Sequence, residues 1–235
     1  MKALLKFILV AVVMCAGMAA WAGDFEDGVS AFDKKNYAVA FQKFRKLAAQ
    51  GNAVAQNNLG LMYKNGQGAV QDYAEAVRWY KLAAAQGNAM GNFNLGHMYL
   101  SGQGVDQDYV EAVRYWKLAA AQGRADAQYN LGLMYDNGQG VVQDYAEAVR
   151  WYRLASAQGN SQAQSNLGAM YVNGQGVVQD YVRAHMWTNL AAVKGDATTA
   201  VKNRDIISAK MSTQQIAEAQ KMARECQARN FKNCD

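Results

Sequence analysis

One phrase recurs four times along this chain at a fixed interval, and this repetition restricts the possible folds more than any other feature. The Leu-Gly pair at its centre stands at 59–60, 95–96, 131–132 and 167–168, 36 residues apart each time. Around that pair, "NNLGLMYKNGQG" returns as "NFNLGHMYLSGQG", "QYNLGLMYDNGQG" and "QSNLGAMYVNGQG". A period of this length indicates a repeat architecture, in which each unit buries its apolar face against the next.

Each unit contains the signals of two helices, as residues 52 to 87 show. Apolar residues of the first half recur at the spacing of one helical face: Ala55, Leu59, Met62 and Tyr63. The glycines of "NGQG" (65–68) can end that helix, and Asp72 with Glu75 forms a capping-box pattern at the start of the next. Gly87 stops the second helix. The unit is therefore predicted to be helix, turn, helix, turn.

The four units predict four helix pairs. Their ranges are 53–64/72–86, 89–100/108–122, 125–136/144–158 and 161–172/180–193. A glycine stands inside every first helix, where it costs about 1 kcal/mol relative to alanine; these are Gly60, Gly96, Gly132 and Gly168. Such a cost at one repeated position indicates close approach of a neighbouring helix.

The repeated residues resemble a known family. The pattern A-x-x-NLG-x-MY-x-x-GQGV-x-QDY-x-EAVRWY-x-LA-x-AQG is similar to the Sel1-like repeat, a relative of the tetratricopeptide repeat, although the chain lacks the loop proline that many relatives carry. Four copies cover 52–195, with a degenerate repeat over 23–51 as an N-terminal cap and a helical C-terminal cap over 196–235. The resemblance implies an all-α, right-handed α/α superhelical solenoid.

The C-terminal cap carries one further helix signal. A helix is predicted from Met211 to Asn230, with Ser212 and Gln215 as a capping box at its start. The segment "RDIISAKMSTQQIAEAQKMAREC" resembles the tail after the final repeat of exported bacterial members. We expect this helix to cover the open end of the stack.

The first 22 residues are typical of a secretory signal. A basic region with Lys2 and Lys6 precedes an apolar run too short for a permanent membrane anchor, and cleavage is predicted after Ala22. A lipoprotein anchored through Cys15 is the alternative, but Met14 stands where such signals carry a small residue. With no Asn-x-Ser/Thr acceptor in the chain, we expect a periplasmic or secreted bacterial protein.

Charge and cysteines agree with an exported protein. The precursor has a formal net charge of +5, which falls to +3 when the signal is removed, and its basic residues are too scattered for a nucleic-acid interface. No later run reaches about 18 apolar residues, so no stable membrane insertion is expected. Cys226 and Cys234 remain after cleavage and are predicted to form a disulfide, with two free thiols as the alternative.

No motif of catalysis is present in the sequence. It contains no His-Glu-x-x-His, no Cys-x-x-Cys and no Ser-x-x-Lys, so no catalytic residue, metal site or cofactor is predicted. The two histidines, His97 and His185, lie in different repeats at positions that other repeats fill with apolar residues. We interpret both as substitutions at partly buried positions and predict that the protein is not an enzyme.

The first helices show where a partner could bind. Beside the constant Leu, Gly, Met and Tyr runs a set of positions that change between repeats, which we call the variable stripe. Its four positions hold Val54, Met90, Asp126 and Gln162; Asn57, Phe93, Tyr129 and Ser165; Leu61, His97, Leu133 and Ala169; Lys64, Leu100, Asp136 and Val172. By resemblance to tetratricopeptide stacks, the first helices line a concave groove.

The predicted groove is centred on Phe93, His97 and Tyr129 and bordered by Lys64 and Asp136. One amide stands beside the stripe in every repeat, at Asn58, Asn94, Asn130 and Asn166, and Asn57 adds another. These amides could hold an extended peptide backbone, or each could bond to the neighbouring helix.

The resulting hypothesis is a scaffold that binds a protein or peptide partner, as the resemblance also implies for an envelope or host-contact process. Two alternatives stay open: a binder of cell-wall glycan or its peptide stems, and a hydrolase of cell-wall material.

Overall fold

The structure, a computed structural model, describes residues 23–194 and 197–234. The predicted signal peptide, its cleavage point and Cys15 lie outside the described residues. The chain divides into two compact units, one ending at Gln107 and the other beginning at Asp108. All regular secondary structure in the described part of the chain is helical, as the all-α prediction requires.

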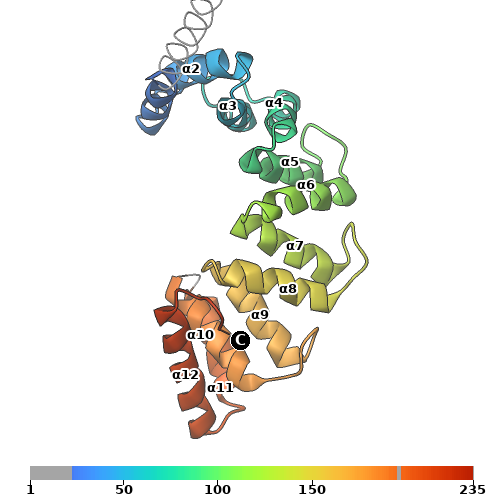
Figure 1. Cartoon of the computed structure of the whole chain (residues 1–235), viewed down its shortest axis with the longest axis vertical. Coiled ribbons are helices and arrows are strands. Elements are labelled where there is room, and N and C mark those ends of the chain that lie inside the picture. The colour runs from blue at the N-terminus through green and yellow to red at the C-terminus, as the bar shows by residue number, and fades with distance from the viewer. Residues whose placement is uncertain (1–22, 195–196, 235) are drawn as a thin grey trace, which may run out of the picture. The chain divides into compact units, whose positions relative to one another are not determined.

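The first unit is a series of helices in which each packs against the next (Figure 1). It comprises a helix over residues 23–33, α2 (Tyr37–Ala49), α3 (Ala53–Asn65), α4 (Tyr73–Ala85) and α5 (Ala89–Ser101). The helix over 23–33 and α2 form the degenerate N-terminal repeat, and the first helices α3 and α5 also contact each other.

The second unit comprises α6 (Tyr109–Ala121), α7 (Ala125–Asn137), α8 (Tyr145–Ser156), α9 (Ser161–Asn173), α10 (Tyr181–Lys194), α11 (Ala197–Ser208) and α12 (Thr213–Ala228). In this unit each helix packs against the next as far as α11, and both α11 and α12 pack against α10. The four predicted helix pairs agree with these bounds to within two residues. The prediction missed α11, since it expected a single helix after the last repeat. Only Ala200 and Ile207 of α11 are buried in the described part of that helix, so its apolar pattern is weak.

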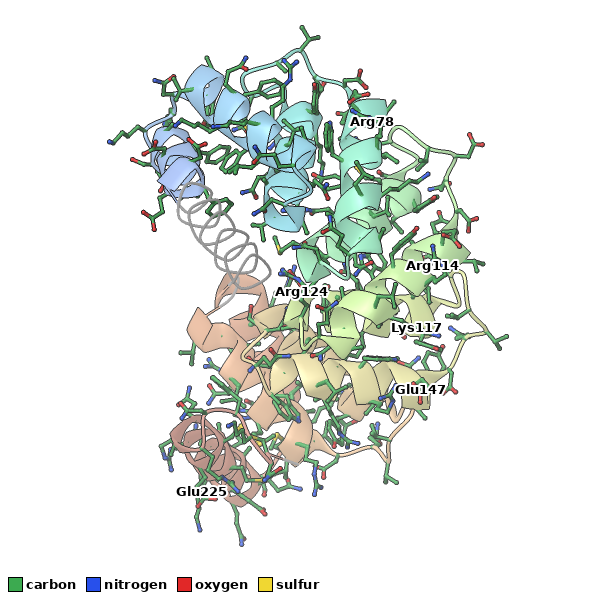
Figure 2. All side chains as sticks on the ribbon, turned by 45° about the horizontal axis from the view of Figure 1, so that its top comes forward. Arg78, Arg114, Lys117, Arg124, Glu147 and Glu225 are labelled. Carbon is green, nitrogen blue, oxygen red and sulfur yellow. A yellow bond between two sulfur atoms is a disulfide. The ribbon has the colours of Figure 1, made fainter. Side chains whose placement is uncertain are left out.

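A capping box consists of two reciprocal hydrogen bonds, and the N-terminal caps of the second helices confirm one of the two. In α4, the Asp72 carboxylate accepts a hydrogen bond from the Glu75 backbone N–H at 2.9 Å. The reciprocal bond from the Glu75 side chain is absent there, because that carboxylate binds the guanidinium of Arg78, which also stacks on Trp79. Arg78 lies at the surface of α4 (Figure 2). The box predicted with Ser212 and Gln215 is complete.

The glycine inside the first helix is explained by the second helix of the same repeat. A Cβ atom on Gly60 would lie 2.7 Å from the ring of Tyr80, and one on Gly132 would collide in the same way with the ring of Tyr152. Both tyrosines are fully buried. The close approach predicted from the sequence is therefore confirmed in these two repeats, where a tyrosine ring fills the space that glycine leaves.

Buried amides connect consecutive repeats. The Gln56 side chain donates to the carbonyl of Ala48 at the end of the preceding helix, and Gln86 donates to the Gln56 side chain at 2.8 Å. The same pair of contacts recurs where Gln128 donates to Ala120 and accepts from Gln158. These bonds satisfy carbonyls that a helix end otherwise leaves unpaired, and they fix one repeat against the next.

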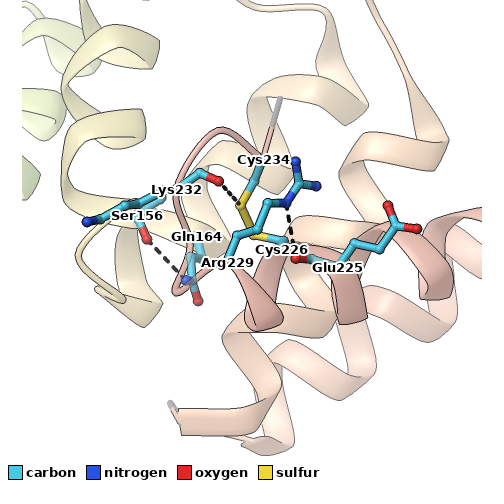
Figure 3. The surroundings of a disulfide bond; sticks show 7 residues. All are labelled: Ser156, Gln164, Glu225, Cys226, Arg229, Lys232 and Cys234. Carbon is cyan, nitrogen blue, oxygen red and sulfur yellow. Dashed lines mark hydrogen bonds between the residues drawn. A yellow bond between two sulfur atoms is a disulfide. The ribbon is translucent and has the colours of Figure 1, made fainter.

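The C-terminal segment is held by a disulfide between Cys226 of α12 and Cys234 (Figure 3). The prediction from the sequence paired the same two cysteines. Between the two cysteines, Phe231 turns its ring toward Gly159, at 3.4 Å from the position of a glycine Cβ. The short loop therefore closes over the end of the helix that precedes the last complete repeat.

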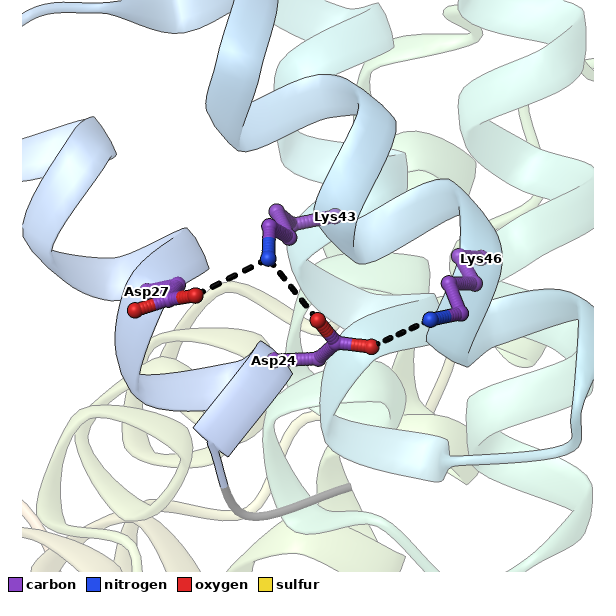
Figure 4. Close-up of polar contacts among 4 residues, drawn as sticks. All are labelled: Asp24, Asp27, Lys43 and Lys46. Carbon is purple, nitrogen blue, oxygen red and sulfur yellow. Dashed lines mark hydrogen bonds and ion pairs between the residues drawn. The ribbon is translucent and has the colours of Figure 1, made fainter. Parts of the chain in front are cut away.

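At the other end, ion pairs attach the helix over 23–33 to α2 (Figure 4). The Lys43 ammonium lies 2.8 Å from Asp24 and 2.9 Å from Asp27, and Lys46 also binds Asp24. The hydrogen bonds from Lys43 and Lys46 lower the pKa of Asp24 from 3.8 to about 2. These contacts, with Phe44 buried beside them, hold the degenerate N-terminal repeat together.

Candidate functional site

The predicted groove residues of the first unit lie on α3 and α5. Asn57 is buried, whereas Asn58 and Lys64 are half-buried. The Asn94 amide donates a 2.8 Å hydrogen bond to the Asn57 side-chain oxygen, which joins the two first helices. For Asn94, the contact favours the alternative in which the amide bonds to the neighbouring helix.

Phe93 and His97 form an aromatic pair on α5. Their ring centroids lie 4.6 Å apart in an edge-to-face arrangement, and both side chains are half-buried. An imidazole beside a phenyl ring presents an apolar surface with one polar edge.

In the second unit, Tyr129 and Asp136 of α7 meet in one polar cluster with Tyr152 and Asn166. The Tyr152 hydroxyl donates to the Asp136 carboxylate at 3.1 Å, and the Tyr129 and Tyr152 rings are 6.1 Å apart. The Asn166 amide lies within hydrogen-bonding reach of both hydroxyls. Burial raises the pKa of Tyr129 and Tyr152, so both phenols stay protonated donors.

The predicted residues thus fall into two sets, one in each unit, and the contacts described above join only part of each set. Asn130, the remaining predicted residue, is half-buried on α7. A single groove through both sets stays a prediction.

The variable stripe lines a hollow in the second unit. Its volume is about 200 Å³, and three of its lining residues come from the stripe of α9: Ser165, Ala169 and Val172. The opposite wall comes from α10 and α11 and includes Thr188, Asn203, Ile206 and Ile207. Sequence reasoning missed this wall because α11 itself was missed.

A second hollow of about 150 Å³ occurs in the first unit. Leu61 of the variable stripe and the adjacent Asn58 line it, opposite Val29, Phe32 and Phe44 of the N-terminal repeat. Each unit therefore has a hollow lined in part by the variable stripe, by Leu61 in the first unit and by Ser165, Ala169 and Val172 in the second.

His185 is buried among the helices of the C-terminal part of the chain. It is 2% exposed, and burial, followed by the charge of Arg204, lowers its pKa. Its Nδ1 atom has no hydrogen-bond partner among the described residues. His185 occupies the position of the buried Val77, Val113 and Val149, which agrees with its interpretation as a substitution inside the repeat.

Neither a metal centre nor a membrane span is found in the described part of the chain. Across residues 23–194 and 197–234, no three His, Cys, Asp or Glu side chains are grouped so that they could hold a metal ion. No helix within the same residues combines the length and apolar character needed to cross a bilayer.

Stacked helix pairs with a variable stripe define a helical repeat protein of the solenoid class. A model of the Sel1 repeat matches four consecutive segments, 53–88, 89–123, 125–160 and 161–196, more than half of the chain. The protein belongs to the Sel1 repeat family. Proteins of this family typically act as scaffolds for protein–protein interaction and are generally not enzymes.

Solved structures agree with this assignment. A protective antigen of uropathogenic Escherichia coli with an SLR fold is 31% identical, with a TM-score of 0.79 over 93% of this chain and 48% of the antigen. This chain therefore spans about half the length of that antigen. A Sel1 repeat protein from Oxalobacter formigenes is 33% identical, with a TM-score of 0.69 over 86% of this chain and 75% of that protein.

A Sel1 repeat protein from Klebsiella pneumoniae shares the fold. It is 24% identical, with a TM-score of 0.52 over 80% of this chain and 93% of that protein. The comparison with curated proteins gave no match.

Proposed function

We propose that this protein is an exported, non-enzymatic scaffold that binds a protein or peptide partner through the variable stripe of its first helices. The observation that carries the proposal is the position of Ser165, Ala169 and Val172. These residues vary between repeats, and they line a hollow of about 200 Å³. Residues that serve only packing stay constant, as the glycine and leucine of the same helices do.

The aromatic residues of the stripe supply anchors for such a partner. Phe93 and Tyr129 are half-buried and keep part of each ring accessible. Aromatic anchors in an interface often contribute more than about 2 kcal/mol each. Phe93 and Tyr129 are therefore the first residues to test.

Partner capture tests the proposal. Replacing Phe93 and Tyr129 with alanine should weaken the recovery of a crosslinked partner from the native bacterium, while the far-ultraviolet circular dichroism spectrum at the assay temperature stays that of the folded protein. Val142→Ala is the matched control, because Val142 is 88% exposed on a loop away from the stripe. If capture survives the double change while the control behaves as wild type, the stripe does not bind the partner.

We also propose that the chain is exported to the periplasm or secreted after cleavage behind Ala22. A disulfide-linked C-terminal segment supports an oxidising compartment, because reducing compartments keep thiols free. The N-terminal sequence of the protein recovered from a periplasmic fraction should begin at Gly23. Recovery of the uncleaved chain in the cytoplasm alone would contradict export.

A further inference from the structure

The second unit presents the variable stripe on two adjacent helices. Tyr129, Leu133 and Asp136 of α7 occupy the same repeat positions as Ser165, Ala169 and Val172 of α9. The helices α7 and α9 contact each other. The residues of α7 therefore continue, one repeat earlier, the row that lines the hollow.

The hollow suits one aliphatic side chain. Its lining combines four apolar residues, Ala169, Val172, Ile206 and Ile207, with four uncharged polar ones, Ser165, Asn173, Thr188 and Asn203, so no lining residue carries a charge that would pair with a charged group. Cavities of roughly 150 Å³ with aliphatic walls accommodate a benzene-sized group, so about 200 Å³ has room for a leucine, isoleucine or methionine side chain.

Asp136 gives the neighbouring part of the stripe a negative charge. Its carboxylate is half-buried, and the hydroxyl of the fully buried Tyr152 orients it through the 3.1 Å hydrogen bond. Asp136 forms no ion pair with any residue between 23 and 194 or between 197 and 234. An ionised carboxylate has about four hydrogen-bond acceptor sites. Most of the acceptor sites of Asp136 are therefore left for a donor group of a bound partner.

The surroundings of Asp136 favour a cation as that donor. Tyr129 stands two helical turns earlier on the same stripe with a half-buried ring, and the face of a tyrosine ring attracts a lysine or arginine group. The equivalent position is Lys64 in the first repeat and Leu100 in the second. A negative charge is thus specific to the third repeat.

We propose that this surface recognises an extended peptide segment of a partner protein that carries one basic and one aliphatic side chain. The basic group binds the Asp136 carboxylate beside Tyr129, and the aliphatic group fills the hollow between α9 and α11. The inference rests on the proposed function and specifies the chemistry of the partner at that site.

Selection from a random linear peptide library displayed on phage tests the inference with a defined probe. Immobilised purified chain should enrich peptides that combine lysine or arginine with leucine, isoleucine or methionine at a fixed separation. Asp136→Lys should reduce the enrichment of basic residues about tenfold, the effect of one charge-assisted hydrogen bond. Ala169→Phe, which fills the hollow, should remove the aliphatic preference and keep the basic one.

Val178→Asp is the matched control, because Val178 is 88% exposed on a loop outside the stripe; it should leave the selected peptides unchanged. The wild-type chain could instead enrich peptides without basic residues that the Ala169→Phe variant no longer enriches. That result would overturn this inference but would still support the proposed function. A selection that yields no peptides, or peptides indifferent to every stripe substitution, would overturn both.

Discussion

At the scale of single residues, the side chain at one repeat position can have a hydrogen-bond partner in one repeat and none among the described residues in another. Tyr80 and Tyr152 both fill the space above a first-helix glycine, and both are fully buried. The Tyr152 hydroxyl donates to Asp136, whereas the Tyr80 hydroxyl has no partner among the described residues. The acceptor is missing in the first repeat because Lys64 stands at the position of Asp136.

This difference predicts opposite effects of one substitution. Tyr152→Phe should destabilise the fold by about 1.5–3 kcal/mol, since it removes a hydrogen bond to a charged group. Tyr80→Phe should be neutral or stabilising, because it removes a buried hydroxyl that lacks a partner. Urea unfolding of the two variants measures both values. Equal destabilisation would contradict the assigned bonding.

We expect His185 to make the stability of the second unit depend on pH. Its pKa in the folded protein is lowered by burial and by Arg204, so the unfolded chain binds the proton more readily. The stabilisation is therefore complete above the unfolded value of about 6.5 and is lost as the pH falls from there through the lowered pKa of the folded protein.

Replacing His185 with valine, the residue at the equivalent buried positions, should remove this dependence and raise stability at pH 5. Thermal unfolding of wild type and His185→Val between pH 5 and 8 provides the comparison. Parallel curves for the two proteins across that range would refute the role of His185.

At the scale of helices, amides at repeated positions join one repeat to the next. The buried glutamine of the first helix reaches a carbonyl eight residues earlier in three repeats, at Gln56, Gln128 and Gln164. The second repeat has Asn92 at this position, one methylene shorter, and its side-chain oxygen is buried without a partner among the described residues.

The longer side chain of Asn92→Gln should place its amide nitrogen, the donor in the other repeats, within reach of the carbonyl of Ala84 and stabilise the first unit by about 0.5–1.5 kcal/mol. The matched reverse change, Gln128→Asn, should destabilise the second unit by a similar amount. Denaturant titration of both variants checks the pair of effects. A loss of stability in Asn92→Gln would show that the shorter side chain is required there.

The disulfide at the end of α12 makes a separate contribution. It closes a loop between positions eight apart, and the chain-entropy estimate for so short a loop is about 2–3 kcal/mol. A Cys226→Ser, Cys234→Ser variant should lose about that much stability. Non-reducing mass spectrometry should find neither thiol open to alkylation, and modification of both would rule out the pairing in the cell.

At the scale of the whole molecule, the sequence predicted the features that recur in every repeat and missed the contacts that differ between repeats. Helix bounds, glycine stops and the Ser212–Gln215 box were confirmed, because each depends on residues close together in the chain. The bond from Tyr152 to Asp136 was not predicted, and for Asn94 the sequence left open whether its amide binds a peptide or the neighbouring helix, where it bonds to Asn57. They depend on which side chains two separate helices bring within reach, and the periodicity contains no such distances.

The C-terminal part shows the same limit. The helix α11 has no repeat motif, so neither its existence nor its contribution to the hollow beside α9 could be anticipated. The groove residues were chosen because they vary and include aromatic side chains. The structure places them in two sets, and the single groove remains a prediction.

Site-specific photocrosslinking tests the central claim, partner binding through the variable stripe, most directly. A benzoylphenylalanine at position 169 lines the hollow of α9, whereas one at position 178 stands on an 88% exposed loop. Irradiation in the native bacterium should give a discrete protein adduct from position 169 and none from position 178. An adduct from position 178 alone would contradict the account.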